Sequence, residues 1–275
     1  NAFMGNVPNE DIAAIVADYP EKFIGVAGID PTNRAKALEE IERFVVNGPL
    51  KAVGMEPGVL ASPMYADDRR IYPIYEYCAE HGIPVLLMGG GGNGPDLSHS
   101  NPIIIDRVCG DFPEMTVINT HGGYPWVTEI LFVAFKRPNL YLCPDMYMYN
   151  MPGVSDYVMA ANTFLSERFL FGTAYPFIGF REGVEQFKAL PFKPEVLPNL
   201  LYRNAIKALK LDIPCGAETK GYPQTSGLGV VNENGYNYVY FTENASAGAI
   251  RYVKDKKGVT EVLDALEFIG NKHDP

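Results

Sequence analysis

The sequence has little of the residue types that build metal and redox sites. Four histidines occur among 275 residues, and the four cysteines, Cys78, Cys109, Cys143 and Cys215, are widely spaced. No Cys-x-x-Cys pair exists, which excludes a zinc ribbon and a thioredoxin-type motif. Such spacing is typical of buried free thiols in a reducing compartment, so we expect a cytoplasmic protein. The opening residues NAFMGNVPNED lack the charged start and apolar core of a signal peptide, which supports the same expectation.

Basic residues and long apolar runs are also scarce. Lys and Arg total 23 against 33 Asp and Glu, which gives a net charge of −10 and a pI near 4.9. This balance disfavours nucleic acid or an anionic membrane as the main partner, and we expect a small-molecule substrate instead. No stretch approaches the ~18 apolar residues of a membrane span. Hydrophobic residues nevertheless make up 47% of the chain, enough for a large buried core.

Apolar runs alternate with amphipathic stretches through the first 211 residues. We expect strands at six places, each followed by a helix: residues 23–30, 51–58, 83–90, 115–123, 140–148 and 169–176. The runs are continuously apolar, as expected when both faces of a strand are covered. The alternation predicts parallel strands with right-handed crossovers, either in a doubly wound sheet or in an eight-stranded barrel. The period alone does not decide between them.

The composition changes at Asp212. Residues 212–229 are rich in Gly, Pro, Ser and Thr and predict a linker. Beyond it, residues 235–241 and 249–255 predict two strands, and residues 259–270 predict a helix. We therefore expect a barrel portion over residues 1–211, a linker over 212–229 and a small α+β tail over 230–275.

Chemically useful side chains stand at the predicted strand ends. In chain order these positions are Asp30, Glu56, Met88, His121, Asp145 and residues 173–175. The carboxyl ends of parallel strands converge on one mouth, where active sites collect. His121 is the strongest candidate, because Gly122 and Gly123 leave space around its ring. Other interpretations stay open: His121 as a core histidine bonded to a backbone carbonyl, Asp30 as a helix cap, and Glu56 as a solvated loop residue.

The glycine run after the third predicted strand has two interpretations. Gly89, Gly91 and Gly94 satisfy the pattern G-x-G-x-x-G, which would favour a nucleotide-dependent enzyme. That fingerprint requires the loop to open directly into a helix, and here Pro95 and Asp96 intervene. The sequence therefore favours an active-site loop whose backbone can approach a ligand.

Three phrases, INTHGGYPW, RFLFGTAYPF and EKFIGVAGIDP, resemble the amidohydrolase-related family, which includes aminocarboxymuconate-semialdehyde and resorcylate-type decarboxylases. The resemblance covers about residues 6–211 and implies a TIM-type (β/α)8 barrel, which we expect here rather than the doubly wound sheet. In this comparison residues 23–30 match the third strand, so the first two barrel strands have no counterpart before it. Since six strands do not close such a barrel, the gap would be filled by the tail, by a partner chain or by further N-terminal residues.

The resemblance also implies where a metal would bind. Members of the family hold a divalent metal, usually zinc, with an H-x-H pair, a histidine on the fifth strand and an aspartate on the eighth. The matching positions here are Met88 and Ala174, and only the sixth-strand histidine, His121, is kept. A thioether or a methyl group does not replace these ligands. We therefore expect no metal and no other cofactor.

These observations predict a hydrolase or a decarboxylating lyase that acts on a small carboxylated or aromatic substrate at the mouth of the barrel. His121 is the predicted acid/base, with Asp145 and Glu56 as further catalytic residues. The expected substrate-binding residues surround the mouth: Asp30, Met88, Tyr124, Trp126, Tyr147 and Tyr175. We expect a homo-oligomer. The alternative function is a catalytically degenerate barrel that serves as a binding or scaffold subunit.

Overall fold

A computed structural model describes residues 7–213 and three further segments, 227–233, 236–242 and 249–252. The chain divides into two compact units. The first comprises Asn1–Ala14 and Gly25–Leu211, and the second comprises Ile15–Ile24 and Asp212–Pro275.

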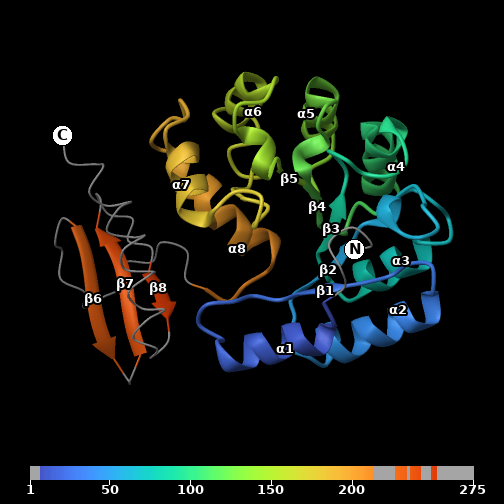
Figure 1. Cartoon of the computed structure of the whole chain (residues 1–275), viewed down its shortest axis with the longest axis horizontal. Helices are drawn as coiled ribbons and strands as arrows, with labels where there is room; N and C mark the ends of the chain where they lie inside the picture. Colours follow the sequence, from blue (N-terminus) through green and yellow to red (C-terminus); the bar gives the residue numbers. More distant parts are fainter. Residues whose placement is uncertain (1–6, 214–226, 234–235, 243–248, 253–275) are drawn as a thin grey trace. The chain divides into compact units, whose positions relative to one another are not determined.

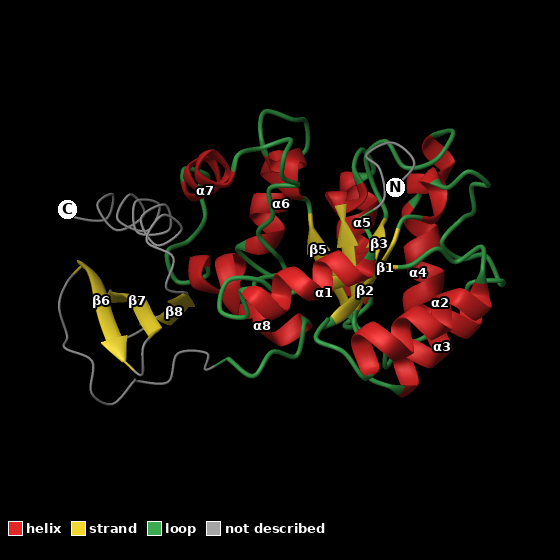
Figure 2. Ribbon diagram, turned by 60° about the horizontal axis from the view of Figure 1, so that its bottom comes forward, coloured by secondary structure: helices red, strands yellow, loops and turns green. Residues whose placement is uncertain are grey.

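A parallel sheet forms the centre of the first unit (Figures 1 and 2). Its five strands follow one another in sequence order: β1 (Val26–Gly28), β2 (Ala52–Met55), β3 (Val85–Met88), β4 (Val117–Thr120) and β5 (Leu140–Cys143). A sixth segment joins the far edge through one parallel bridge, between Leu142 and Phe169. The predicted alternation and the α/β barrel-type architecture are confirmed. The ladders are shorter than the predicted strands because the chain bends into loops as soon as each strand reaches the mouth.

Helices follow each strand and surround the sheet (Figure 1). Those that link successive strands are α2 (Arg34–Ile41), α3 (Tyr72–Glu80), α4 (Pro102–Asp111) and α5 (Val127–Lys136), with α6 (Val154–Ala161) after β5. The remaining helices are α1 (Asn9–Asp18) before β1, and α7 (Phe180–Lys188) and α8 (Asn204–Ala208) near the end of the unit. Two π-helical stretches adjoin these helices: η1 (Glu42–Val46) after α2 and η6 (Asn199–Arg203) before α8.

The sequence of α4 shows how such a helix is specified. Asn101 caps its start by accepting a hydrogen bond from the backbone N–H of Ile103, and Pro102 occupies the first turn, where a missing N–H has no cost. Ile104, Ile105, Val108 and Cys109 are buried and share one face, as the helical period requires. Burying each such side chain contributes about 1.5–3 kcal/mol.

Both faces of the sheet are covered. Val85, Leu87, Val117, Leu140 and Leu142 are fully buried on one face. On the other, Leu86, Ile118 and Tyr141 are neighbours across the strands and pack with Leu170 and with Ala208 of α8. This double burial explains why the strands are continuously apolar in the sequence.

Some predicted elements are shorter than expected. The pattern of residues 155–168 predicts one helix after the fifth strand, but α6 ends at Ala161. The side chain of Asn162 bonds instead to Pro191 O and Lys193 N, and the hydroxyl of Thr163 donates to Met159 O, so these residues favour a turn over another helical turn. The strand predicted over 169–176 is reduced to the single bridge at Phe169.

The described strands of the tail form a separate antiparallel sheet, β6 (Gly227–Glu233), β7 (Tyr236–Thr242) and β8 (Ala249–Tyr252). β7 and β8 match the two predicted strands. β6 was not predicted, because its glycines are uncommon in strands. Among the described strands, none of these three pairs with β1–β5, so they add no strand to the parallel sheet. The helix predicted over 259–270 lies outside the described residues. No helix in the described part is long and apolar enough to cross a membrane.

Candidate active site

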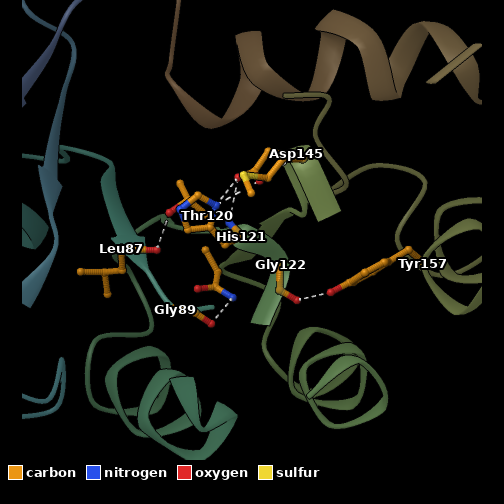
Figure 3. A network of polar contacts seen from close by, with 9 residues as sticks. Leu87, Gly89, Thr120, His121, Gly122, Asp145 and Tyr157 are labelled. Atoms are coloured by element: carbon orange, nitrogen blue, oxygen red, sulfur yellow. Dashed lines mark hydrogen bonds and ion pairs between the residues drawn. The ribbon is translucent and has the colours of Figure 1, made fainter. Parts of the chain in front are cut away.

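His121 and Asp145 meet where β4 and β5 end (Figure 3). Thr120 and Cys143, the last residues of the two strands, are register partners, so the residues that follow them emerge side by side. The imidazole Nδ1 lies 3.0 Å from Asp145 Oδ1 and 2.9 Å from Oδ2. Asp145 is buried, with a side chain 6% exposed, while the His121 side chain is 19% exposed. The structure thus brings together two of the three predicted catalytic residues.

The contacts of Asp145 fix the orientation of the imidazole. An ionised carboxylate only accepts hydrogen bonds, so Nδ1 of His121 must carry the shared proton. The same carboxylate accepts the backbone N–H of His121 at 2.9 Å and that of Met146 at 2.6 Å. A carboxylate held at three points cannot rotate freely. Nε2 of His121 is then the ring nitrogen left to exchange a proton with a ligand.

Both residues have an unusual backbone. His121 has φ of +60° and Asp145 has φ of +44°, in the left-handed region that ordinary residues rarely adopt. Each such conformation costs on the order of 1 kcal/mol and persists where surrounding contacts enforce it. Ala174, five residues after the bridge at Phe169, shares it with φ of +49°. Strain of this kind clusters at functional sites, which supports a functional role for the mouth.

The turn that carries His121 is anchored from several directions. The turn is a short 3₁₀ helix, η4 (His121–Gly123). Tyr157 of α6 donates its hydroxyl to Gly122 O at 2.8 Å, and Thr120 donates its hydroxyl to Leu87 O at 3.2 Å (Figure 3). Burial raises the pKa of Tyr157, so its phenol remains a neutral donor. His121 is therefore held rigidly by neighbouring elements.

Two aromatic rings border the imidazole. The ring of Tyr147 meets His121 edge-on at 5.6 Å, and Tyr124 stacks on Tyr147 at 4.6 Å. Burial, together with the negative charge of Asp145, raises the pKa of Tyr147. Two of the predicted substrate-binding residues thus lie beside the His121–Asp145 pair and form an aromatic wall next to it.

The glycine run packs against this wall. A Cβ on Gly90 would lie 2.5 Å from His121 O, and one on Gly91 would lie 2.2 Å from the Tyr147 hydroxyl. Gly91 also has φ of +65°, and its N–H donates to Tyr124 O at 2.7 Å. The N–H of Gly92 bonds to Tyr147, and that of Gly89 lies 3.4 Å from Thr120 O. Because these N–H groups already have protein partners, the loop does not form a phosphate cradle.

Several buried polar atoms near the mouth lack a hydrogen-bond partner within the described residues. Four of the six such atoms belong to residues that follow β2, β3 or β4: Glu56 Oε2, Asn93 Oδ1, His99 Nδ1 and Trp126 Nε1. A fifth is Asn119 Oδ1, inside β4. The asparagine oxygens face glycine carbons, of Gly58 and Gly89. His99 Nδ1 lies 3.7 Å from Asp96 Oδ1, an ion-pair distance that is long for a hydrogen bond. Glu56 Oε2 and Trp126 Nε1 have no such neighbour, and a buried polar group without a partner is costly unless a ligand or water satisfies it.

Other predicted residues do not join the pair. Asp30 is exposed, and its Oδ1 accepts from the backbone and hydroxyl of Thr32 in its own turn. Tyr175 is 76% exposed. Met88 ends β3 half-buried, and its carbonyl accepts a hydrogen bond from Asn93. The substrate-binding roles of these three residues stay predictions, as do the catalytic role of Glu56 and the roles of the residues that do lie together.

Sequence reasoning missed three side chains that support the mouth. Asn93 donates to Met88 O at 2.8 Å and to His99 O at 3.0 Å, so it ties the loop after β3 to its strand. Asn119 is fully buried in β4, and Tyr157 anchors η4. An asparagine inside the apolar strand VINT was a usable signal for Asn119. No comparable signal marks Asn93 or Tyr157, because their partners are backbone carbonyls, which any residue carries.

The described residues do not supply a zinc site. No group of three or more His, Cys, Asp or Glu side chains between residues 7 and 213 is arranged to hold a metal ion. Met88, the register partner of Thr120, and Ala174 offer only a thioether and a methyl group at the positions where the resemblance implies ligands. Zinc prefers imidazole, thiolate and carboxylate ligands, so this donor set does not fit it. The expectation that no metal is used stays a prediction.

Comparison with solved structures defines the class of fold. An uncharacterized TIM-barrel protein from Bordetella bronchiseptica is 48% identical, with a TM-score of 0.73, over 76% of this chain and 74% of that one. The 2,6-dihydroxybenzoate decarboxylase from Rhizobium is 16% identical, with a TM-score of 0.61, over 74% and 76% of the two chains. The 4-oxalomesaconate hydratase from Rhodopseudomonas palustris is 20% identical, with a TM-score of 0.57, over 74% and 70%. The protein is thus of the TIM-barrel class.

The family follows from the sequence match. Residues 1–211 match the amidohydrolase family, which is most of the chain. The chain belongs to this family, and the predicted resemblance is confirmed. No curated protein sequence matches the chain.

Proposed function

We propose that the chain is a carbon–carbon lyase that removes the carboxylate of a small aromatic acid, with His121 as the acid/base. One observation carries this proposal: Asp145 holds Nδ1 of His121, which leaves Nε2 to deliver a proton at the mouth. Decarboxylation of an electron-rich ring needs one well-placed acid more than an activated water.

The proposed reaction needs only His121, the substrate and one water molecule. Protonated His121 gives the proton on Nε2 to the ring carbon that bears the carboxylate. The bond between that carbon and the carboxylate then breaks, CO₂ leaves, and the electron pair of the broken bond restores the aromatic ring. Water returns a proton to His121. Asp145 keeps the imidazole in one orientation through both steps.

The surroundings of the pair suit an aromatic acid. Tyr124 and Tyr147 offer a flat wall against which a substrate ring can stack. The unpartnered Nε1 of Trp126 is a donor for a carboxylate or phenolate oxygen, and Glu56 Oε2 is an acceptor for a phenolic hydroxyl. Solved structures of similar fold include decarboxylases named for 2,6-dihydroxybenzoate and 5-carboxyvanillate, which supports this substrate class.

The hydrolase alternative is less favoured by the donor set. Hydrolysis in a site of this kind needs an activated water, and metal coordination is a common means of activation. The described residues offer no three-ligand set for that purpose, whereas they do offer a fixed imidazole. We therefore rank the lyase reaction first.

The test incubates the purified chain with dihydroxybenzoates and with lactone-like esters after exhaustive chelation, and follows CO₂ release and ester cleavage. We expect CO₂ release that persists after chelation and disappears in His121→Asn. If turnover vanishes with chelator and returns with zinc, the metal-free reaction is wrong. If His121→Asn keeps full turnover, the role of His121 is wrong. Ligand-induced thermal shifts without any product would favour the binding or scaffold subunit.

A further inference from the structure

The outer face of α5 exposes large apolar side chains. Phe132 is 66% exposed and Phe135 is 62% exposed, and their rings lie 6.2 Å apart. Phe164, which follows α6, meets Phe135 edge-on at 5.5 Å. On the other side, Ile103 of α4 is 49% exposed and lines the same groove as Phe132. We call these four side chains the α5 patch.

The α5 patch lies over three neighbouring helices. α4, α5 and α6 stand side by side around the sheet (Figure 1). The groove between α4 and α5 has a volume of about 500 Å³, and its polar lining includes Asp106 and Glu129. The patch is therefore an apolar surface with a hollow along one edge and charges beside it.

The size of the patch exceeds that of an incidental exposed residue. A phenylalanine presents 150–250 Å² of surface, so the exposed parts of the three rings amount to roughly 300 Å². Patches of this size on monomers are often functional. A standard interface covers ~800 Å² per partner, with an apolar centre and a polar rim, and the α5 patch suits the centre.

The charges of α5 indicate what the partner is. Glu129 and Lys136 are seven residues apart, which is about two helical turns, so they lie on the same flank of the helix about 10 Å apart. Phe132 stands between them. If two copies of α5 pack antiparallel around a two-fold axis near Phe132, Glu129 of each copy meets Lys136 of the other. The helix face is thus complementary to itself.

We propose that the chain forms a symmetric homodimer through the α5 patch. The aromatic rings form its centre, and two Glu129–Lys136 pairs form part of its rim. Lys136 lies 2.9 Å from Asp106 of its own chain and keeps a side chain 49% exposed, so its ammonium has donors left for a second carboxylate. This proposal is independent of the proposed reaction.

The first test measures the mass of the full chain in solution by sedimentation equilibrium. We expect a dimer at about 10 µM, as for interfaces of standard size. Phe132→Ser should raise the dissociation constant at least tenfold, roughly the effect of losing a central aromatic anchor in both copies. Phe180→Ser, at a 58% exposed ring on α7, is the matched control and should leave it unchanged.

The second test reverses the charges. Glu129→Lys and Lys136→Glu each place like charges opposite one another and should weaken the dimer about tenfold. An equimolar mixture of the two variants should recover dimers, because every Lys then faces a Glu. The combined variant should also dimerise. Glu114→Lys, at an exposed carboxylate outside the α5 patch, is the control.

Three results would overturn the proposal. The first is a wild-type chain that stays monomeric up to about 100 µM. The second is a dimer that survives Phe132→Ser, and the third is a pair of charge variants that do not recover on mixing. Melting temperatures of all variants separate these results from unfolding, and the mixing experiment does not depend on the Lys136–Asp106 contact that Lys136→Glu removes.

Discussion

The two halves of the mouth use similar residues in different ways. At the ends of β4 and β5, His121 and Asp145 are tied to each other across neighbouring strands. At the end of β1, Asp30 also follows a strand, but its carboxylate is bound by Thr32 within its own turn. Position at a strand end therefore does not by itself bring two side chains together. The difference lies in whether the partner comes from another strand or from the next few residues.

The largest expected effect concerns catalysis. His121→Asn and Asp145→Asn should each lower turnover of the proposed substrate class about 10²–10⁴-fold, since the first removes the acid and the second leaves the ring unoriented. Asp30→Asn should lower turnover less than Asp145→Asn does, because the contacts of its carboxylate lie within its own turn. Steady-state rates on folded variants measure both. An Asp30 variant as impaired as the Asp145 variant would break the comparison.

Substitution by alanine should destabilise the protein at Gly91 but have little effect at the neighbouring Gly92. Gly91→Ala is expected to lower the free energy of unfolding by about 2–4 kcal/mol, from its left-handed backbone and its overlap with the Tyr147 hydroxyl. Gly92→Ala has no neighbouring atom within 4 Å and should cost less than about 1 kcal/mol. Chemical denaturation measures both, and Tyr147→Phe should partly rescue Gly91→Ala. Equal costs at the two glycines would contradict the packing described.

A smaller effect is expected where the loop after β3 is tied to its strand. Asn93→Ala leaves Met88 O and His99 O without this donor and should cost about 2 kcal/mol. Asp30→Ala, which removes an exposed turn contact, should cost about 0.5 kcal/mol. Urea unfolding of the two variants compares long-range with local tethering directly. The distinction fails if Asp30→Ala is the more costly change.

The smallest effect concerns alkaline pH. Burial and the charge of Asp145 raise the pKa of Tyr147. Above the ordinary tyrosine pKa, near 10, the unfolded chain releases this proton and the folded chain retains it, so stability falls as pH rises. Tyr147→Phe should make the loss of stability above pH 10 less steep, as measured by denaturation at pH 8, 10 and 11. An unchanged slope would place the phenol in a more solvated setting.

Much of the fold could be predicted because its determinants are local and periodic. Continuous apolar runs such as residues 83–88 specify strands that are covered on both faces, and the cap of α4 is legible in Asn101–Pro102. For the site, the sequence predicts only that side chains at strand ends lie close together. This is correct for His121 and Asp145. β6 was missed because glycines carry no strand signal.

The support of the site could not be predicted, because it depends on contacts between distant residues. Tyr157 bonds to Gly122 O from 35 positions away. The pattern of the glycine run likewise does not predict what it packs against. Gly91 contacts Tyr147, which lies in the loop after β5. A pattern of glycines shows that backbones approach closely, but it does not say what they approach.

The most direct test of the central claim is the tautomer of His121, read from long-range ¹H–¹⁵N correlation spectra and assigned with His121→Asn. At a pH where the ring is neutral, we predict a proton on Nδ1 and none on Nε2, and loss of this preference in Asp145→Asn. A proton on Nε2 in the wild-type chain, or a tautomer unaffected by Asp145→Asn, would contradict the account.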